Sequence, residues 1–237
     1  MGIKVVLFDL DGTLLPLDQD IFIKYYFGLL AKKLAPHGYD PDLLIKSIWA
    51  GTGEMVKNSG KKTNEEVFWD KFAEIHGEKA RDDEPYFEEF YKEEFCKVQE
   101  ASCGYTPDAA KAVAAIKAMG LRVALATNPI FPAIATEQRI AWAGLKPSDF
   151  ELYTTYENSR HSKPNPAYYT DVASALGVSP EDCLMVGNDV GEDMIAEALG
   201  MKVFLMPECI INKDGKDISR YPQGDFDDLI KYIKEQI

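Results

Sequence analysis

The chain has 237 residues, more than one small domain needs and fewer than two full domains use. Hydrophobic residues make up 46% and aromatic residues 11%, which excludes a disordered chain, a collagen-like fibre and a disulfide-stabilised miniprotein. With 26 basic and 39 acidic residues the formal charge is −13, so neither nucleic acid nor an anionic membrane is expected as a partner. Most of this excess is expected to be solvated surface, but a smaller group of carboxylates is a candidate cation site.

The cysteines and the first residues of the chain indicate the expected compartment. The four cysteines form no CxxC pair and lack the spacing of zinc ligands, so we expect no disulfide framework and a cytoplasmic protein. The apolar run that begins at Ile3 meets an acidic residue at Asp9, which makes it too short for a signal peptide or a membrane span.

Short apolar runs alternate with helical patterns over much of the chain. Strands are expected at Ile3–Phe8, Leu121–Ala126, Leu152–Thr155, Cys183–Val186 and Lys202–Leu205. Helices are expected at Thr106–Gly120, Pro132–Ala143, Asn165–Gly177 and Gly191–Leu199. This alternation predicts an α/β fold, in which helices cover both faces of a doubly wound parallel sheet.

Residues 18–100 depart from this alternation because they contain no convincing strand. Four amphipathic helices are expected there, at Ile21–Leu34, Pro41–Val56, Asn64–His76 and Pro85–Val98. The sequence therefore predicts a catalytic core made of residues 1–16 and 102–237, with an inserted α-helical cap at 17–101. The insertion is rich in aromatic residues, most of them expected in its core and a few in a substrate cleft.

The first predicted strand ends in Asp9-Leu10-Asp11-Gly12-Thr13. In open parallel sheets, ligands bind beyond the carboxyl ends of the strands. Alternation along the chain places Asp9 and Asp11 on one side, where two carboxylates repel each other unless a cation or a shared proton neutralises them. Gly12 lets the backbone turn and approach a ligand. This motif is the most specific signal in the chain.

Three further strand ends carry polar groups. Thr127 and Asn128 follow the second strand and offer donors to an oxyanion. Lys163 lies just before a predicted helix, at an end that attracts anions. Asp189 and Asp193 follow the fourth strand and provide the oxygen ligands that Mg²⁺ prefers, although each alone would also fit a helix cap.

Taken in order, these motifs resemble those of the haloacid-dehalogenase-like hydrolases, in particular phosphatase-type members with a helical cap inserted after the first motif. The resemblance implies that Asp9 is the nucleophile and forms an aspartyl-phosphate. It implies that Asp11 protonates the leaving oxygen and then activates water. Mg²⁺ is expected as the cofactor, held by the Asp9 carboxylate, the Asp11 backbone carbonyl and Asp189, with Asp193 in direct or water-mediated support.

The resemblance also implies that Gly12, Thr127, Asn128 and Lys163 bind the phosphoryl group, with Thr127 and Lys163 contributing to catalysis. One departure concerns the fourth motif, because many relatives place the metal-binding aspartate directly after glycine. Here Asn188 intervenes between Gly187 and Asp189, which leaves Asn188 open as an alternative ligand.

The expected activity is Mg²⁺-dependent hydrolysis of a small phosphorylated metabolite. The alternatives are a phosphomutase, a phosphonate hydrolase that uses a lysine of the cap, a metal-independent 2-haloacid dehalogenase and a non-catalytic binding protein. The cap is expected to open and close through residues Leu14–Asp20 and Glu100–Thr106. The sequence indicates neither the substrate nor an oligomeric state.

Overall fold

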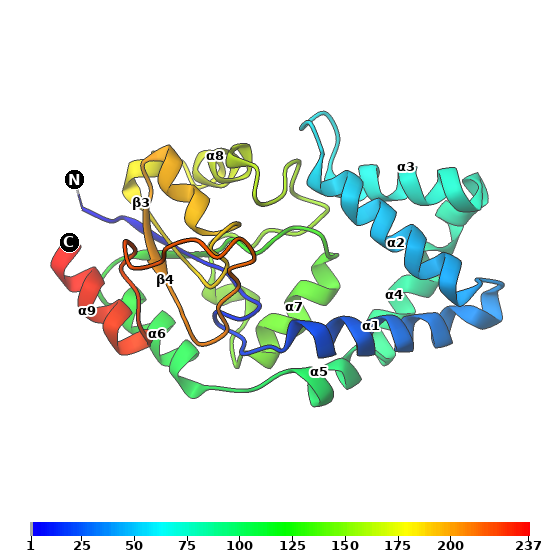
Figure 1. Ribbon diagram of the computed structural model, residues 1–237, viewed down its shortest axis with the longest axis horizontal. Helices are drawn as coiled ribbons and strands as arrows, with labels where there is room; N and C mark the ends of the chain where they lie inside the picture. Colours follow the sequence, from blue (N-terminus) through cyan, green and yellow to red (C-terminus); the bar gives the residue numbers. More distant parts are fainter. Residues whose placement is uncertain (1) are drawn as a thin grey trace.

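The computed structural model describes residues 2–237, and its centre is a sheet of four parallel strands (Figure 1). The strands are β1 (Val5–Phe8), β2 (Arg122–Leu125), β3 (Cys183–Gly187) and β4 (Lys202–Leu205). Their order in the sheet is β2-β1-β3-β4, and β1 pairs with β2 and β3 so that Val5 lies opposite both Arg122 and Cys183. The predicted parallel α/β architecture is confirmed.

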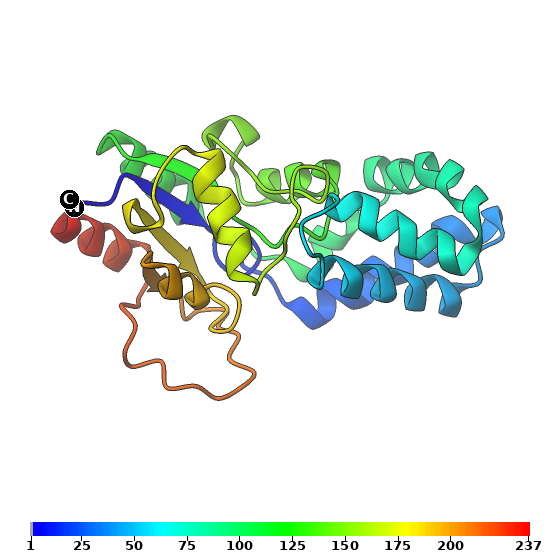
Figure 2. The same cartoon turned by 90° about the horizontal axis from the view of Figure 1, so that it is seen from above.

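Successive side chains of β1 enter two different hydrophobic clusters, one on each face of the sheet. Val6 and Phe8 pack in the cluster that includes residues of α6 and α9, whereas Val5 and Leu7 pack with α8. Helices therefore cover both faces, as a doubly wound sheet requires (Figure 2). The core helices are α6 (Pro107–Ala118), α7 (Ala133–Trp142), α8 (Pro166–Ala175) and α9 (Phe226–Gln236), with short 3₁₀ turns η3 (Pro147–Asp149), η4 (Pro180–Asp182) and η5 (Met194–Leu199).

Three core elements differ from the sequence prediction. The strand expected at Leu152–Thr155 is only an isolated bridge between Tyr153 and Leu125, because its pairing with β2 ends after a few backbone hydrogen bonds. The helix expected at Gly191–Leu199 is reduced to the 3₁₀ turn η5, because the residues before it form a loop closed by side-chain contacts. Helix α9 was not predicted, although the Asp225 side chain caps it.

Five helices between β1 and β2 form a separate layer at one end of the molecule, called the helical unit here (residues 19–102; Figure 1). A Cβ on Gly51 would lie 2.6 Å from the Phe68 ring, so this glycine allows α2 and α3 to pack closely. The predicted helix at Pro85–Val98 is divided in two. The helices are α1 (Gln19–Leu34), α2 (Pro41–Val56), α3 (Asn64–His76), α4 (Glu84–Glu93) and α5 (Cys96–Ser102), with 3₁₀ turns η1 (Ala35–His37) and η2 (Glu78–Asp83).

Two chain crossings join the helical unit to the sheet, and they lie side by side. Leu17 and Cys103 form an antiparallel bridge. On either side of it, Gly104 N donates to the Pro16 carbonyl at 2.8 Å, and Asp18 N donates to the Ser102 carbonyl at 3.0 Å. The two crossings therefore form a short paired ribbon.

A third attachment is non-covalent and lies at the start of α3. Asn64 N donates to the Ser159 carbonyl at 2.8 Å, and Glu65 N donates to the Tyr156 carbonyl at 2.9 Å. These bonds tie the helical unit to the loop that leads to Lys163.

Among the described helices, none combines the length and apolar character needed to cross a membrane.

Candidate active site

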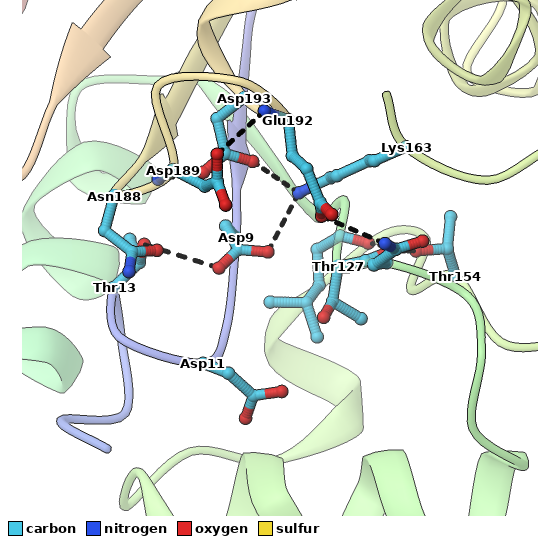
Figure 3. Close-up of polar contacts among 12 residues, drawn as sticks. Asp9, Asp11, Thr13, Thr127, Thr154, Lys163, Asn188, Asp189, Glu192 and Asp193 are labelled. Carbon is cyan, nitrogen blue, oxygen red and sulfur yellow. Dashed lines mark hydrogen bonds and ion pairs between the residues drawn. The ribbon is translucent and has the colours of Figure 1, made fainter. Parts of the chain in front are cut away.

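The polar motifs meet at the carboxyl end of the sheet (Figure 3). Asp9 directly follows β1, Thr127 lies shortly after β2, and Asn188 directly follows β3. Backbone pairing continues into the site, since Asp9 N donates to the Val186 carbonyl at 2.9 Å. The rigid sheet thus fixes the starting points of the loops that carry these side chains.

Lys163 lies at the centre of the site and is buried. Its Nζ donates to Asp9 Oδ1 at 2.8 Å and to Asp193 Oδ1 at 2.6 Å (Figure 3). Burial disfavours the charged form of Lys163, but Asp193 and Asp9 outweigh it and raise its pKa well above the usual value, so the ammonium persists. Burial raises the pKa of Asp193, and the Lys163 charge opposes that shift. One cation therefore holds carboxylates from two strand ends.

The loop after β1 packs against the loop after β3 through Asn188. The Thr13 hydroxyl donates to Asn188 Oδ1 at 3.1 Å and lies 3.5 Å from Asp9 Oδ2. Gly12 has φ +85°, and a Cβ there would lie only 2.2 Å from Asn188 Nδ2. Glycine is thus required here for its backbone conformation and for the close approach of the Asn188 amide.

Arg139, which the sequence analysis did not identify, pairs with Asp11. It belongs to α7, its side chain is only 1% exposed, and its guanidinium Nη1 donates to Asp11 Oδ2. The guanidinium also lies 4.4 Å from the centre of the Phe131 ring. Burial raises the pKa of Asp11 and outweighs the lowering effect of Arg139. Asp11 Oδ1 is buried with no partner among residues 2–237.

The predicted phosphate-binding residues after β2 lie on the same cavity as Asp9. The Thr127 carbonyl accepts hydrogen bonds from Thr154 Oγ1 at 2.7 Å and from the Tyr168 hydroxyl at 2.9 Å, which fixes this loop. Asn128 Nδ2 donates to Glu192 Oε2 at 2.9 Å, whereas Asn128 Oδ1 is buried without a partner in the described chain. Burial raises the pKa of Glu192, a second group that the sequence analysis did not identify.

The fourth-motif aspartates have different partners. Asp189 Oδ1 accepts from Gly191 N at 2.7 Å and from Glu192 N at 2.9 Å, so half of this carboxylate closes its own loop. Asp193 Oδ2 accepts from Asp189 N at 2.9 Å, which leaves both oxygens of Asp193 engaged. A Cβ on Gly187 would lie 2.1 Å from Asp193 Oδ2, so a glycine is needed beside this carboxylate.

Oxygen atoms suited to a hard cation remain on one side of Asp9. Its Oδ2, which Lys163 does not hold, faces the Thr13 hydroxyl and lies near the Asn188 amide. Across residues 2–237, no group of three or more His, Cys, Asp or Glu side chains is arranged as a metal centre. Mg²⁺, however, is usually held by one or two carboxylates together with water and substrate phosphate. Asp9 with Asn188 or Asp189 fits that requirement.

One cavity of about 230 Å³ connects the site with the helical unit. Most of the predicted site residues line it; Lys163 lies behind Asp9, and Gly12 lies behind Asn188. Arg160 and His161, in the loop that leads to Lys163, do not line the cavity; they contact the Lys61 carbonyl and Asp171. The cavity therefore has a charged floor at the strand ends and a wall formed by the helical unit.

Comparison with known proteins identifies one hydrolase family and relatives named as phosphatases. A family profile described as haloacid dehalogenase-like hydrolase matches residues 3–198. The chain is 27% identical over 208 residues to the putative phosphatase YhcW of Bacillus subtilis (strain 168), covering 88% of this chain and 85% of that protein. It is 27% identical over 225 residues to a phosphoglycolate phosphatase of Colwellia psychrerythraea, covering 94% and 92%.

The likeness extends to solved structures. An L-2-haloacid dehalogenase from Xanthobacter autotrophicus, with chloropropionic acid covalently bound, matches with a TM-score of 0.58 at 16% identity. The match covers 99% of this chain and 100% of that one, and it shows a shared fold.

Proposed function

The chain belongs to the haloacid dehalogenase-like hydrolase family, as its motifs predicted, and on this premise we propose that it is a Mg²⁺-dependent phosphatase acting on small phosphorylated metabolites. The phosphatase names of its relatives support this proposal. The main supporting observation is that two aspartates at the same cavity have different cationic partners. Asp9 accepts a hydrogen bond from Lys163, whereas Asp11 accepts one from Arg139.

In the proposed first step, Asp9 attacks phosphorus, the bond from phosphorus to the ester oxygen breaks, and Asp11 gives its proton to that oxygen. Water then attacks the aspartyl-phosphate, Asp11 takes a proton from it, and inorganic phosphate leaves. Lys163 holds the Asp9 carboxylate in place and offsets charge on the transferring group, to which Thr127 and Asn128 donate. The raised pKa of Asp11 supports its role as the acid.

We assign the cation site to Asp9, the Asp11 carbonyl, and Asp189 or Asn188, with Asp193 acting through Lys163 and the Asp189 amide rather than directly. Five carboxylates line the cavity against the two buried cations Arg139 and Lys163, an imbalance that supports a bound cation. Mg²⁺ supplies positive charge to the phosphoryl oxygens. If Asp189 is a ligand, Asp189→Asn raises the Mg²⁺ concentration needed for half-maximal activity; Asn188→Ala provides the matched comparison for the alternative ligand.

The other candidate reactions have less support. A phosphonate hydrolase needs a lysine of the cap, but within residues 2–237 no lysine of the helical unit lines the cavity. A metal-independent dehalogenase does not need an acid at the position of Asp11. A phosphomutase would return the phosphoryl group to an organic molecule, so release of inorganic phosphate separates it from a phosphatase. A non-catalytic binding protein has no need of the Asp9 and Lys163 pair.

We also propose that residues 17–101 act as a cap domain over the core residues 1–16 and 102–237, closing on the substrate through the paired ribbon. The cavity between the two parts supports this division. The four free cysteines support a reducing compartment such as the cytoplasm.

The test is hydrolysis of 4-nitrophenyl phosphate with and without Mg²⁺. We expect activity that a chelator removes and that Asp9→Asn lowers at least about a thousandfold. Asp228→Asn is the matched control, since Asp228 is 53% exposed in the first turn of α9 and does not line the cavity, and it retains activity. Full activity in chelator, or an active Asp9→Asn enzyme, would contradict the proposal.

A further inference from the structure

The wall of the cavity opposite the carboxylates is aromatic. Eight aromatic residues of the helical unit line it, among them Phe22, Tyr26, Trp49, Phe68, Trp69 and Phe87. They come from four helices that are far apart in the sequence, and most pack in ring-to-ring contact with one another. The substrate's leaving group lies opposite Asp9 with its oxygen next to Asp11, so the rest of it has to occupy the space bounded by these rings.

This wall offers little to a polar leaving group. Within residues 2–237, no charged side chain of the helical unit lines the cavity, and Gln19 and Thr52 are its non-aromatic polar members. The hydroxyls of Tyr26 and Tyr91 are buried and bond to each other at 2.9 Å. A sugar or a carboxylate placed there would lose its water and find only Gln19 and Thr52 as non-aromatic polar partners in this wall, which is costly.

The buried cations are also engaged. Arg139 pairs with Asp11, and Lys163 pairs with Asp9 and Asp193. Lys213 lines the cavity but is exposed, so it lies at the entrance rather than against the rings. A substrate with a second anionic group would therefore find no free buried cation among the described residues.

One buried polar atom of the wall lacks a hydrogen-bond partner among the described residues. The indole Nε1 of Trp69 is buried and makes no hydrogen bond of acceptable geometry within the described chain, although the Tyr156 hydroxyl lies close to it. Trp69 is 7% exposed and lines the cavity. A ligand with a single acceptor can satisfy this donor.

From these contacts we infer that the substrate is the phosphate monoester of an apolar, ring-bearing alcohol with at most one hydrogen-bond acceptor near Trp69. This inference rests on the proposed phosphatase function. This substrate class does not include phosphoglycolate, the substrate in the names of several relatives, because phosphoglycolate carries a carboxylate and no apolar group. The small volume of the cavity, below the usual range for ligand pockets, restricts the leaving group to about one ring.

The test compares benzyl phosphate with phosphoglycolate and glycerol 3-phosphate in the presence of Mg²⁺. All three have alcohol leaving groups, so differences report recognition more than the reactivity of a phenol. We expect kcat/KM for benzyl phosphate to exceed the other two at least about tenfold, equivalent to about 1.4 kcal/mol. Equal values, or a preference for phosphoglycolate or glycerol 3-phosphate, overturn the inference.

Variants test whether the ring wall causes the preference. Trp49 is 50% exposed, so its replacement leaves the fold intact; Trp49→Ala should reduce the benzyl preference several-fold, while Trp49→Phe retains it. Tyr25→Ala is the matched control, because Tyr25 is 47% exposed on α1 and does not line the cavity. An unchanged preference in Trp49→Ala, or an equal loss in Tyr25→Ala, overturns the inference.

The two proposals fail in different ways. If 4-nitrophenyl phosphate is not hydrolysed with Mg²⁺, the phosphatase function itself is wrong. If it is hydrolysed by an Asp9-dependent reaction and benzyl phosphate is not preferred, the phosphatase function stands and the apolar substrate class is wrong.

Discussion

Replacing Asn64 tests how strongly the helical unit is tied to the sheet. Asn64 is fully buried at the start of α3. Its Nδ2 donates to the Pro129 carbonyl and to Ser162 Oγ, both at 3.0 Å, and its Oδ1 accepts from Asn58 Nδ2 at 2.8 Å. Asn64→Ala removes these three hydrogen bonds and a longer one, from Nδ2 to the His161 carbonyl at 3.4 Å, and it leaves the Pro129 carbonyl and the Ser162 hydroxyl buried without this partner.

The expected cost follows from these contacts. A typical hydrogen bond contributes about 0.5–1.5 kcal/mol net, and a buried group left unpaired costs about 1–3 kcal/mol. Since Asn58 Nδ2 keeps a second acceptor in the Lys62 carbonyl, we expect the free energy of unfolding to fall by about 2–4 kcal/mol. For a chain of this length that lowers Tm by about 5–15 °C.

Urea unfolding followed by circular dichroism, together with calorimetry, measures both quantities. Asn212→Ala is the matched control, because Asn212 also makes two hydrogen bonds, to the Lys216 backbone, but in an exposed loop where water replaces them. We expect the control to lose less than about 1 kcal/mol. If Asn64→Ala loses no more than Asn212→Ala, the reasoning that this contact anchors the helical unit is refuted.

Two further predictions concern the catalytic loops. Arg139→Met removes the charge that lowers the pKa of Asp11, so that pKa rises further, Asp11 stays protonated to higher pH, and the alkaline limb of kcat/KM moves to higher pH; an unmoved limb would argue against Asp11 as the acid. Gly12→Ala displaces the Asn188 amide and raises the Mg²⁺ requirement, whereas Gly38→Ala, also at positive φ (+91°) but with open space around it, destabilises the fold by about 1 kcal/mol without changing that requirement.

The elements predicted well from the sequence were those defined by local patterns. The strand ends that carry Asp9, Thr127 and Asn188 follow short buried runs bounded by turn residues, and parallel pairing brings such ends to one edge. Family membership and the doubly wound sheet followed from that order. The segment at Leu152–Thr155 was predicted as a strand because of its β-branched composition, but composition does not reveal that its pairing stops at one bridge.

Arg139 shows what a local pattern misses. It lies four residues after Ala135 and three before Trp142, both buried on α7, so a charged residue stands in the apolar register of the helix. A charged residue at an apolar position of a helix can be recognised in the sequence. Its partner Asp11 cannot, because the two residues are 128 positions apart and nothing near either one indicates the pairing. The sequence predicted that a few aromatic residues of the insertion line a substrate cleft, but not which ones, because packing between helices brings these rings together.

The paired ribbon of Pro16–Asp18 and Ser102–Gly104 restricts how this protein can be re-engineered. Adding one residue to a single crossing would slip the Leu17 and Cys103 register and turn the remaining side chains of that crossing to the opposite face. A different helical insertion can therefore be grafted onto this sheet only if both crossings are transferred together as one hydrogen-bonded unit, with their lengths matched residue for residue.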